Sequence, residues 1–503
     1  MSAPATAPVT EDDAVSSLAT FATLPGWLAA AMHGQRVAAE LERQVPELSS
    51  GALRLQSCTP ERLRAKGDEW LARYRLRVAP GEPAVGSESP SEHADAEIVL
   101  VGWLLAPAQT APSAPTAPSD APADGAQFGR PGWECWLPEL RLQLQAQASD
   151  EALPALPTLV DPVAAAELLG PILHEAGYLP ATITSCRPEV VRYKPGSRCT
   201  VVVRLTYDSG AGEPTPPTPV VLKTHQGDKG QTAWAAMTAL WERASTWQHA
   251  VAMAEPLAYL PDERILVQGP VPEERTLKVL ARSAITDGGP AALDELRDEL
   301  RRTARALAAV HLSGAEYGRT ATFEDEVAEV REVVARLSLT VPQLEFAAEP
   351  LLRLFEDRSV AAPADAVVAA HHDFRPAQVL LDAGGVGFID FDGASMAEPA
   401  LDLGRFRAKL RDIGISALTG SGQPMSGEPL AANLRLLDEL CDHFLIAYEA
   451  YAPVSRARVL LWESCDLLTA MLHAWTKVRL LRVEPRMAVL LHQLGTSGLI
   501  RTD

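Results

Sequence analysis

The chain has 503 residues, of which 47% are hydrophobic, enough for about two to four domains with large cores. Its formal net charge of −20 disfavours nucleic acid as a partner and suits a cationic small substrate, although solubility is the commoner reason for such a charge. No apolar run approaches the roughly 20 residues that span a bilayer, the first residues do not resemble a signal peptide, and the cysteines lack metal-binding spacing. We therefore expect a cytoplasmic protein with reduced thiols that binds neither membranes nor nucleic acid.

The first 150 residues predict one helix followed by strands. Apolar residues at near-helical spacing predict a helix from Leu24 to about Gln44. Alternating or continuous apolar residues predict strands at 52–55, 70–78, 97–105 and within 133–147. Between them, residues 106–132 are rich in Ala, Pro, Ser and Thr and cannot bury enough apolar surface to offset their ordering entropy. We expect a disordered surface insertion there.

The segment 151–268 predicts a small, β-rich domain. Asp161 can cap a helix whose first turn contains Pro162. A second helix is predicted from about 231 to 245. Strands are predicted at four places, namely 184–194, 200–207, 220–225 and 265–268.

These two segments resemble each other. Residues 57–66 and 185–194 are identical at six of ten positions, and Trp103 falls near the place of Lys223. Each matching stretch is followed by a strand that contains the pair Arg-Leu, at Arg75-Leu76 and at Arg204-Leu205. We therefore predict that residues 1–150 form a cap that is a degenerate copy of the next domain, with chance likeness between two hairpins as the alternative. A copy with Trp in place of Lys could not hold phosphates, so its role would be structural.

The remaining segment, 269–503, predicts mainly helices around one polar strand–turn–strand pattern. An apolar strand runs into the turn His371-His372-Asp373, and a second strand, 379–381, leaves that turn. A third apolar strand ends on Asp390 and is followed closely by Asp392. Hairpin-related strands that each deliver an acid to one edge can form a site for a metal ion and a nucleophile. Asp392 could neighbour such a metal, but its place after a strand favours a turn former.

The spacing of these residues resembles the catalytic loop and metal-binding strand of kinase-like phosphotransferases, and in particular of the aminoglycoside phosphotransferase family. That family's loop reads His-Gly-Asp followed five residues on by Asn, and the segment 398–404, Glu-Pro-Ala-Leu-Asp-Leu-Gly, is similar to its Asp-Pro-Ala-x-Asp-Leu signature. The chain departs from this pattern at His372, where the family has Gly, and at Gln378, where it has Asn. Gln carries the same amide oxygen on a longer stem, so it can still bind a hard cation with a shifted reach.

The resemblance implies a two-lobed, kinase-like α+β fold. The small nucleotide-binding lobe would cover 151–268, the helical catalytic and substrate lobe 269–503, and the additional N-terminal cap or pseudo-lobe 1–150. The resemblance also implies that Asp373 orients or deprotonates the substrate hydroxyl and that Gln378 and Asp390 bind Mg²⁺. His371 and Asp402 would brace the catalytic loop through hydrogen bonds.

Lys223 is the main candidate for binding the nucleotide. It ends an apolar strand, where an ammonium group is unusual without an anion, so we predict that it binds the phosphates; a surface lysine at a strand end is the alternative. Its acidic partner stays open, because the following helix offers only Gln231 early and Glu242 late.

Two further features of the small lobe concern the nucleotide. The turn 195–198 could cover the phosphates, with Gly196 allowing close backbone approach and Arg198 offering charge, or it could be an ordinary hairpin turn. By the resemblance, the strand that ends at Gln268 is the hinge whose backbone pairs with adenine.

Together these features predict an enzyme that phosphorylates a hydroxyl of a small molecule, such as a sugar, an amino sugar or an aminoglycoside, from ATP or GTP with Mg²⁺. The extended N-terminal region is more similar to the maltokinase-like members in architecture. The alternative, suggested by His372 and Gln378, is a catalytically impaired nucleotide-binding or scaffold protein. A protein kinase fits less well, because no Arg precedes Asp373 and no activation segment separates Asp390 from Glu398.

Overall fold

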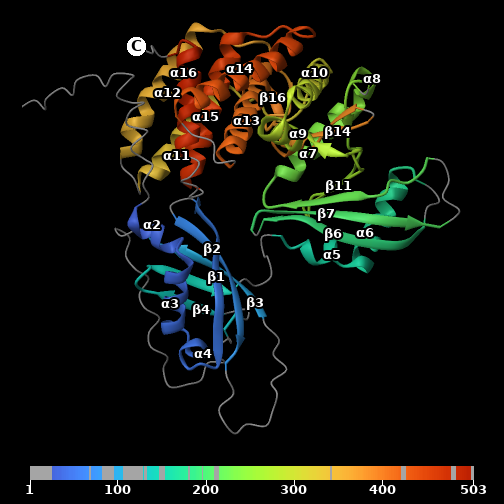
Figure 1. Cartoon of the computed structure of the whole chain (residues 1–503). Coiled ribbons are helices and arrows are strands. Elements are labelled where there is room, and N and C mark those ends of the chain that lie inside the picture. Colours follow the sequence, from blue (N-terminus) through green and yellow to red (C-terminus); the bar gives the residue numbers. More distant parts are fainter. Residues whose placement is uncertain are drawn as a thin grey trace, which may run out of the picture. The chain divides into compact units, whose positions relative to one another are not determined.

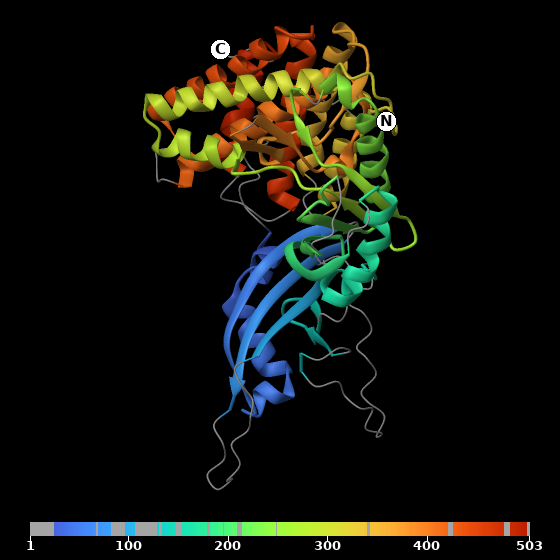
Figure 2. The same cartoon turned by 90° about the vertical axis from the view of Figure 1, so that its right-hand side faces the viewer.

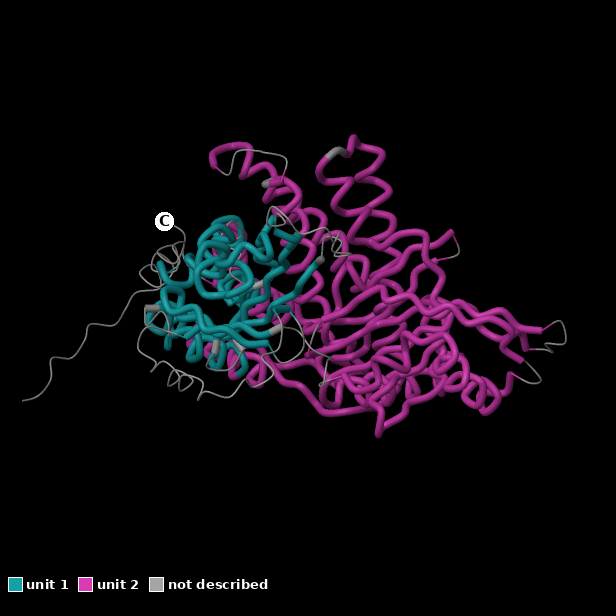
Figure 3. Tube along the Cα trace, turned by 90° about the horizontal axis from the view of Figure 1, so that it is seen from below, with its two compact units in different colours: residues 1–149, 329–352, 469–487 teal, residues 150–328, 353–468, 488–503 magenta. Residues whose placement is uncertain are grey.

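The computed structural model confirms a mixed α+β fold (Figure 1). It describes residues 25–66, 69–81, 96–105, 128–129, 133–146, 153–178, 182–194, 196–208, 214–247, 249–339, 343–383, 385–420, 426–476 and 483–499. The chain divides into two compact units (Figure 3). Unit 1 comprises 1–149, 329–352 and 469–487, and unit 2 comprises 150–328, 353–468 and 488–503. The predicted insertion at 106–132 lies outside the described residues, apart from Phe128 and Gly129.

Unit 1 contains an antiparallel five-stranded sheet in the order β1-β2-β3-β5-β4. Its strands are β1 (Leu53–Lys66), β2 (Glu69–Pro80), β3 (Ala96–Leu104), β4 (Glu134–Leu137) and β5 (Leu142–Ala146). Among the described residues, the helices α2 (Gly26–Ala31), α3 (Gly34–Gln44) and α4 (Pro46–Ser49) precede the sheet. Helix α3 packs on β1 and β4, and the blue part of Figure 2 shows the long strands as one curved layer.

The single helix predicted over 24–44 is wrong, because the chain breaks it between α2 and α3. At that point Gly34 passes close to β1, and a Cβ atom on residue 34 would lie 2.2 Å from the carbonyl oxygen of Cys58. Only glycine permits this approach of helix and strand. The break lets α3 lie against the sheet, where Val37 and Leu41 are buried.

Unit 2 contains a second antiparallel five-stranded sheet in the order β10-β11-β8-β7-β6. Its strands are β6 (Ile183–Lys194), β7 (Arg198–Tyr207), β8 (Val220–His225), β10 (Pro256–Leu260) and β11 (Ile265–Gln268). Before the sheet come α5 (Leu156–Val160) and α6 (Pro162–Glu175), and the Asp161 side chain caps α6 by accepting from the backbone of residues 163 and 164. After β8 come α7 (Lys229–Glu242) and α8 (Ala244–Trp247).

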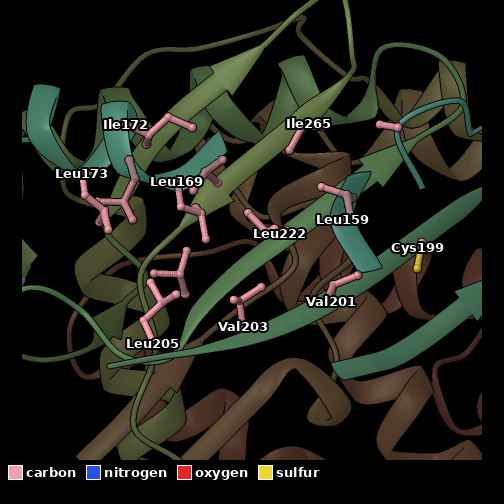
Figure 4. Close-up of a cluster of buried hydrophobic side chains, with 14 of the residues drawn as sticks. Leu159, Leu169, Ile172, Leu173, Cys199, Val201, Val203, Leu205, Leu222 and Ile265 are labelled. Atoms are coloured by element: carbon pink, nitrogen blue, oxygen red, sulfur yellow. The ribbon is translucent and has the colours of Figure 1, made fainter. Parts of the chain in front are cut away.

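Alternating residues of the second sheet form a core with α5 and α6, because successive side chains of a strand point to opposite faces. Figure 4 shows leucines of the two helices against the strands β7, β8 and β11. The labelled members of this core are Leu159, Leu169, Ile172, Leu173, Cys199, Val201, Val203, Leu205, Leu222 and Ile265.

The two sheets have the same topology. Counted along the chain, the strands of each lie in the order first, second, third, fifth, fourth, and helices α3 and α6 each pack on the first and fourth of them. The sequence match coincides with the pairing, because Cys58 pairs with Leu76 in one sheet and Cys186 with Leu205 in the other.

The register also extends the match to the third strand of each sheet. Leu71 of β2 pairs with Trp103, and Thr200, which holds the corresponding place in β7, pairs with Lys223. Trp103 therefore occupies in the first sheet the position that Lys223 occupies in the second. We propose on this basis that the N-terminal sheet is a degenerate copy of the small lobe. The boundaries predicted for the three domains remain predictions.

The rest of the chain is mainly helical. The helices are α9 (Leu277–Asp287), α10 (Pro290–His311), α11 (Phe323–Ser338), α12 (Gln343–Ala361), α13 (Pro399–Gly420), α14 (Gly427–Glu449), α15 (Arg456–Thr476) and α16 (Val483–Thr496). None of the described helices is long and apolar enough to cross a membrane.

Short strands among these helices carry the predicted catalytic segment. A four-stranded sheet has the order β12-β14-β15-β9, and β13 pairs with β16. Their bounds are β9 (Ala252–Met253), β12 (Arg275–Thr276), β13 (Val368–Ala370), β14 (Val379–Asp382), β15 (Gly385–Phe388) and β16 (Ser395–Ala397), with 3₁₀ turns η2 (Pro376–Gln378) and η3 (Phe391–Gly393).

Candidate active site

The loop between β13 and β14 and the segment after β15 lie side by side. Strands β14 and β15 form an antiparallel hairpin in which Val379 pairs with Phe388. Beyond this pair, the backbone N–H of Ile389 donates to the carbonyl of Gln378 at 3.2 Å. The hairpin therefore brings Asp390 back beside the loop that holds Asp373. All of the site residues described below belong to unit 2.

Two residues of this segment have left-handed backbone conformations. His372 has φ = 66° and Asp390 has φ = 73°. Such values favour glycine, because a side chain on an L-residue crowds the following carbonyl. The glycine that the resemblance expects at position 372 is thus the residue that suits the local backbone, and His372 adopts the same conformation at a cost of about 1 kcal/mol.

Asp402, at the start of α13, holds the loop between β13 and β14 through hydrogen bonds to its backbone. Its fully buried carboxylate accepts from the backbone N–H groups of His371 at 2.7 Å and His372 at 2.8 Å. The Nε2 atom of His311 lies 3.1 Å from the same carboxylate. Burial opposes ionisation of this group, but the contacts with His311 and His371 lower the pKa of Asp402 overall. The ring of His371 is itself anchored, with Nε2 3.0 Å from the carbonyl oxygen of Ile389. Asp402 and His371 thus make the kind of hydrogen bonds expected of residues that support the loop containing Asp373.

Gln378 connects the two predicted functional acids. Its Nε2 atom donates to Asp373 at 3.0 Å and to Asp390 at 3.4 Å. Asp373 has a side chain that is 42% exposed and also pairs with Arg375 at 3.1 Å, so it is accessible to a small molecule. The structure thus brings together the three residues that the sequence assigns to the acceptor and the metal.

The chemistry of these side chains fits a divalent cation. The Oε1 atom of Gln378 is buried and has no hydrogen-bond partner, while its amino group faces two carboxylates. Rotation of the amide would present the oxygen instead, next to Asp390, and carboxylate and amide oxygens are ligands that Mg²⁺ accepts. Among the described residues there is no group of three or more His, Cys, Asp or Glu side chains arranged for a metal.

Cations from the second sheet meet the acids that follow β15. Lys223 Nζ lies 3.1 Å from Asp390 and 3.5 Å from Asp392. Arg198 Nη1 lies 2.9 Å from Asp392 and 3.5 Å from Asp390. His225 Nε2 lies 2.8 Å from Asp392 Oδ2, the oxygen that Arg198 also contacts. The partners of Lys223, which the sequence left open, are therefore Asp390 and Asp392 rather than an acid of α7.

Strand register explains why the side chains of Arg198, Lys223 and His225 lie together. Arg198 pairs directly with His225 across β7 and β8, and Lys223 lies two residues before His225. Paired residues, and residues two apart in a strand, share one face of a sheet, so all three side chains lie on the same face.

The cations lower the pKa of both acids. Burial is the largest single influence on Asp390 and would raise its pKa, but the positive charges around it, Lys223 first and then Arg198, lower the pKa overall. Burial opposes ionisation of Asp392 as well, but Lys223 and His225 hold its pKa far below the usual range. Both groups are therefore carboxylates at neutral pH. Asp392 lies in the turn η3, as expected of a turn former, but its buried ion pairs were not predicted.

The remaining predicted residues lie in the second sheet. Gly196 has φ = 61° in the turn between β6 and β7, a conformation that glycine adopts readily. Gln268 is buried and pairs with Val221 and Pro256, and the N–H of the next residue, Gly269, donates to Glu255. No described contact tests the proposed roles of Gly196 in phosphate binding or of Gln268 at an adenine hinge.

Sequence reasoning missed three participants. His311 is 91 residues from Asp402, so no local pattern links them. Arg192 on β6 lies two residues before Lys194, which pairs with Arg198, so it shares their face of the sheet, and partial burial and the charge of Arg198 lower its pKa. His225 could have been found, because it lies two residues after Lys223 in a predicted strand and hence on the same face.

The phosphotransferase enzyme family model matches residues 279–420. Among solved structures, a glucosamine kinase in complex with glucosamine, ADP and inorganic phosphate is 13% identical, with a TM-score of 0.45 over 91% of this chain and 99% of that one. A choline/ethanolamine kinase family protein from Mesorhizobium loti is 15% identical, with a TM-score of 0.44 over 67% and 96%. No curated protein matches in sequence. Residues 279–420 of this chain are therefore similar to the phosphotransferase enzyme family.

Proposed function

We propose that this protein transfers the terminal phosphoryl group of ATP to a hydroxyl group of a small molecule, with Mg²⁺ as cofactor. The observation that carries the proposal is that the Gln378 side chain contacts both Asp373 and Asp390. Lys223, from strand β8, contacts the same Asp390. Phosphoryl transfer needs positioning and positive charge around the phosphates more than covalent help from the protein. A cytoplasmic location, where ATP is available, is part of the proposal, and GTP is the alternative donor.

Asp373 is the residue that would act on the acceptor. Its carboxylate is accessible and is held by Gln378 and Arg375, so its orientation is set before an acceptor binds. An ionised carboxylate can accept a hydrogen bond from a substrate hydroxyl and take its proton as the transfer proceeds. His371 and Asp402 keep the loop in place through the contacts described above.

The other charged residues would hold the phosphates. Asp390 and the amide oxygen of Gln378 would hold Mg²⁺, which would supply positive charge to offset the negative charge of the phosphates. Lys223 and Arg198 place two positive charges at the same end of the sheet, where they can balance the negative charge of the transferred group.

An ATP-consumption screen over sugars, amino sugars, aminoglycosides and choline-like alcohols tests the proposal. With any accepted compound, Asp373→Asn should bind Mg²⁺-nucleotide as the wild type does but lose transfer by at least about 100-fold, because only the interaction with the reacting hydroxyl changes. Asp262→Asn, which alters an exposed acid in the turn between β10 and β11, is the matched control and should retain full activity.

The same screen separates the enzyme from a scaffold. A catalytically impaired scaffold would bind nucleotide and consume no ATP with any acceptor. Transfer that persists in Asp373→Asn would show that another residue handles the hydroxyl.

A further inference from the structure

The lysine at the centre of the phosphate site is held in an unusual way. In protein kinases the corresponding lysine pairs with a glutamate of the helix that follows its strand. In this chain that helix is α7, and its only acid is Glu242, an exposed residue at its last position. Helix α7 therefore offers no carboxylate to Lys223.

Asp392 supplies a carboxylate in place of one from the helix. It lies in η3, against which α7 packs directly, and its side chain is 8% exposed. One of its oxygens lies 3.5 Å from Lys223 Nζ, and the other contacts Arg198 and His225. Asp392 thus contacts Lys223 from a turn that packs against α7.

His225 fixes the orientation of Asp392. Because an ionised carboxylate only accepts hydrogen bonds, Nε2 of His225 carries the hydrogen in their 2.8 Å contact. The imidazole is buried, and its Nδ1 atom has no hydrogen-bond partner, so Asp392 is its polar anchor. The contact occupies one oxygen of Asp392 and leaves the other directed at Lys223.

We propose that Asp392, held by His225, is the positioning residue for Lys223 during nucleotide binding. The inference rests on the proposed function. Lys223 is now nearest to Asp390, at 3.1 Å, but the carboxylate of Asp390 is also the leading metal ligand. A carboxylate engaged with a cation attracts a lysine less, so Asp392 is the acid that remains to hold the ammonium group.

The direction in which loss of the Asp392 charge changes nucleotide affinity distinguishes a positioning residue from a simple repelling charge and from a metal ligand. Removing a negative charge beside the phosphates would by itself tighten nucleotide binding. A positioning residue predicts the opposite, because Lys223 then loses its place. If Asp392 were instead a metal ligand, its loss would raise the Mg²⁺ concentration required, and saturating Mg²⁺ would restore the affinity for nucleotide.

Isothermal titration of the full chain with ADP, with and without Mg²⁺, measures these effects. We expect Asp392→Asn to weaken binding of ADP at saturating Mg²⁺ by roughly tenfold, the size of one charge-assisted contact. Binding of metal-free ADP should weaken less, because Asp390 can then still hold Lys223. In a Lys223→Met background the same substitution should cause no further loss, because the residue it positions is gone. Thr224→Val is the matched control, because it alters the residue between Lys223 and His225 on the opposite face of β8, and should leave affinity unchanged.

Two variants of His225 test whether this residue holds Asp392 in place. His225→Leu should reproduce most of the loss in ADP affinity, whereas His225→Gln, whose amide can donate to Asp392, should retain most of the affinity. They also serve if Asp392→Asn fails to fold.

Unchanged or tighter ADP binding at saturating Mg²⁺ in Asp392→Asn or in His225→Leu overturns the inference, as does an equal loss in the presence and absence of Lys223. A wild type that binds no nucleotide under either condition overturns the proposed function as well. Wild-type binding combined with an unaffected Asp392→Asn variant overturns only the role of Asp392.

Discussion

Replacing His372 by glycine should make the stability of the protein less sensitive to acid. His372 lies in the left-handed region at φ = 66°, and its Nδ1 atom contacts Ser395 Oγ at 2.8 Å. Burial, and then the positive charge of Arg405, lower the pKa of His372 from its usual 6.5 to about 4. The folded protein therefore keeps this imidazole neutral over a range in which an unfolded chain protonates it.

Near pH 7.5 the effects of His372→Gly nearly cancel. Relief of left-handed strain stabilises the variant by about 1 kcal/mol. Loss of the contact with Ser395 costs about 1 kcal/mol, and the more flexible unfolded chain costs about 0.5–1 kcal/mol. The expected net change is a destabilisation of at most about 1 kcal/mol.

At pH 5 we expect His372→Gly to be more stable than the wild type. A histidine whose pKa is lowered on folding contributes no penalty above the unfolded pKa and destabilises the fold as the pH falls from about 6.5 towards about 4. At pH 5 this linkage destabilises the wild type by about 2 kcal/mol, and glycine at position 372 does not titrate. The variant should therefore gain about 2 kcal/mol relative to the wild type between pH 7.5 and pH 5.

Urea denaturation of both proteins at the two pH values, followed by tryptophan fluorescence, measures the difference in unfolding free energy. His174→Gln, at an exposed histidine of α6, is the control and should show the same difference from the wild type at both values. A difference for His372→Gly that does not change with pH, or that moves towards greater relative instability in acid, would refute the account of a buried, neutral imidazole.

Substitutions at three further positions test other parts of the structure. Lys223→Ala should abolish most of the rise in melting temperature that Mg²⁺-ATP causes, as thermal-shift assays that compare each protein with and without nucleotide will show. Gln378→Asn, which keeps the amide oxygen, should retain turnover within roughly tenfold, and Gln378→Leu should lose metal-dependent turnover in a phosphotransfer assay. Glu398→Ala should destabilise the fold by about 3–5 kcal/mol in urea denaturation, because Arg458, bonded to Glu398 at 2.9 and 3.0 Å, would remain buried with its main counter-charge removed.

The sequence by itself determined the parts of the site that are close along the chain. Asp373, Gln378 and Asp390 are joined by one hairpin, and the pairing of neighbouring strands follows from short apolar runs separated by a tight turn. The likeness between the two five-stranded sheets was also visible, because the repeated residues lie at matching cross-strand pairs. In each case, neighbours in sequence are neighbours in space.

The tertiary structure alone decided which charges meet. Lys223 and Asp390 are 167 residues apart, and His225 and Asp392 are also separated by 167 residues, so no local pattern could pair them. Whether Asp392 is a surface turn residue or a buried partner depends on how η3 packs against α7 and meets the charged residues of the second sheet. Charged side chains are buried only where packing supplies partners. The local pattern specified the acids, and the long-range packing of sheet against hairpin specified the cations that hold them.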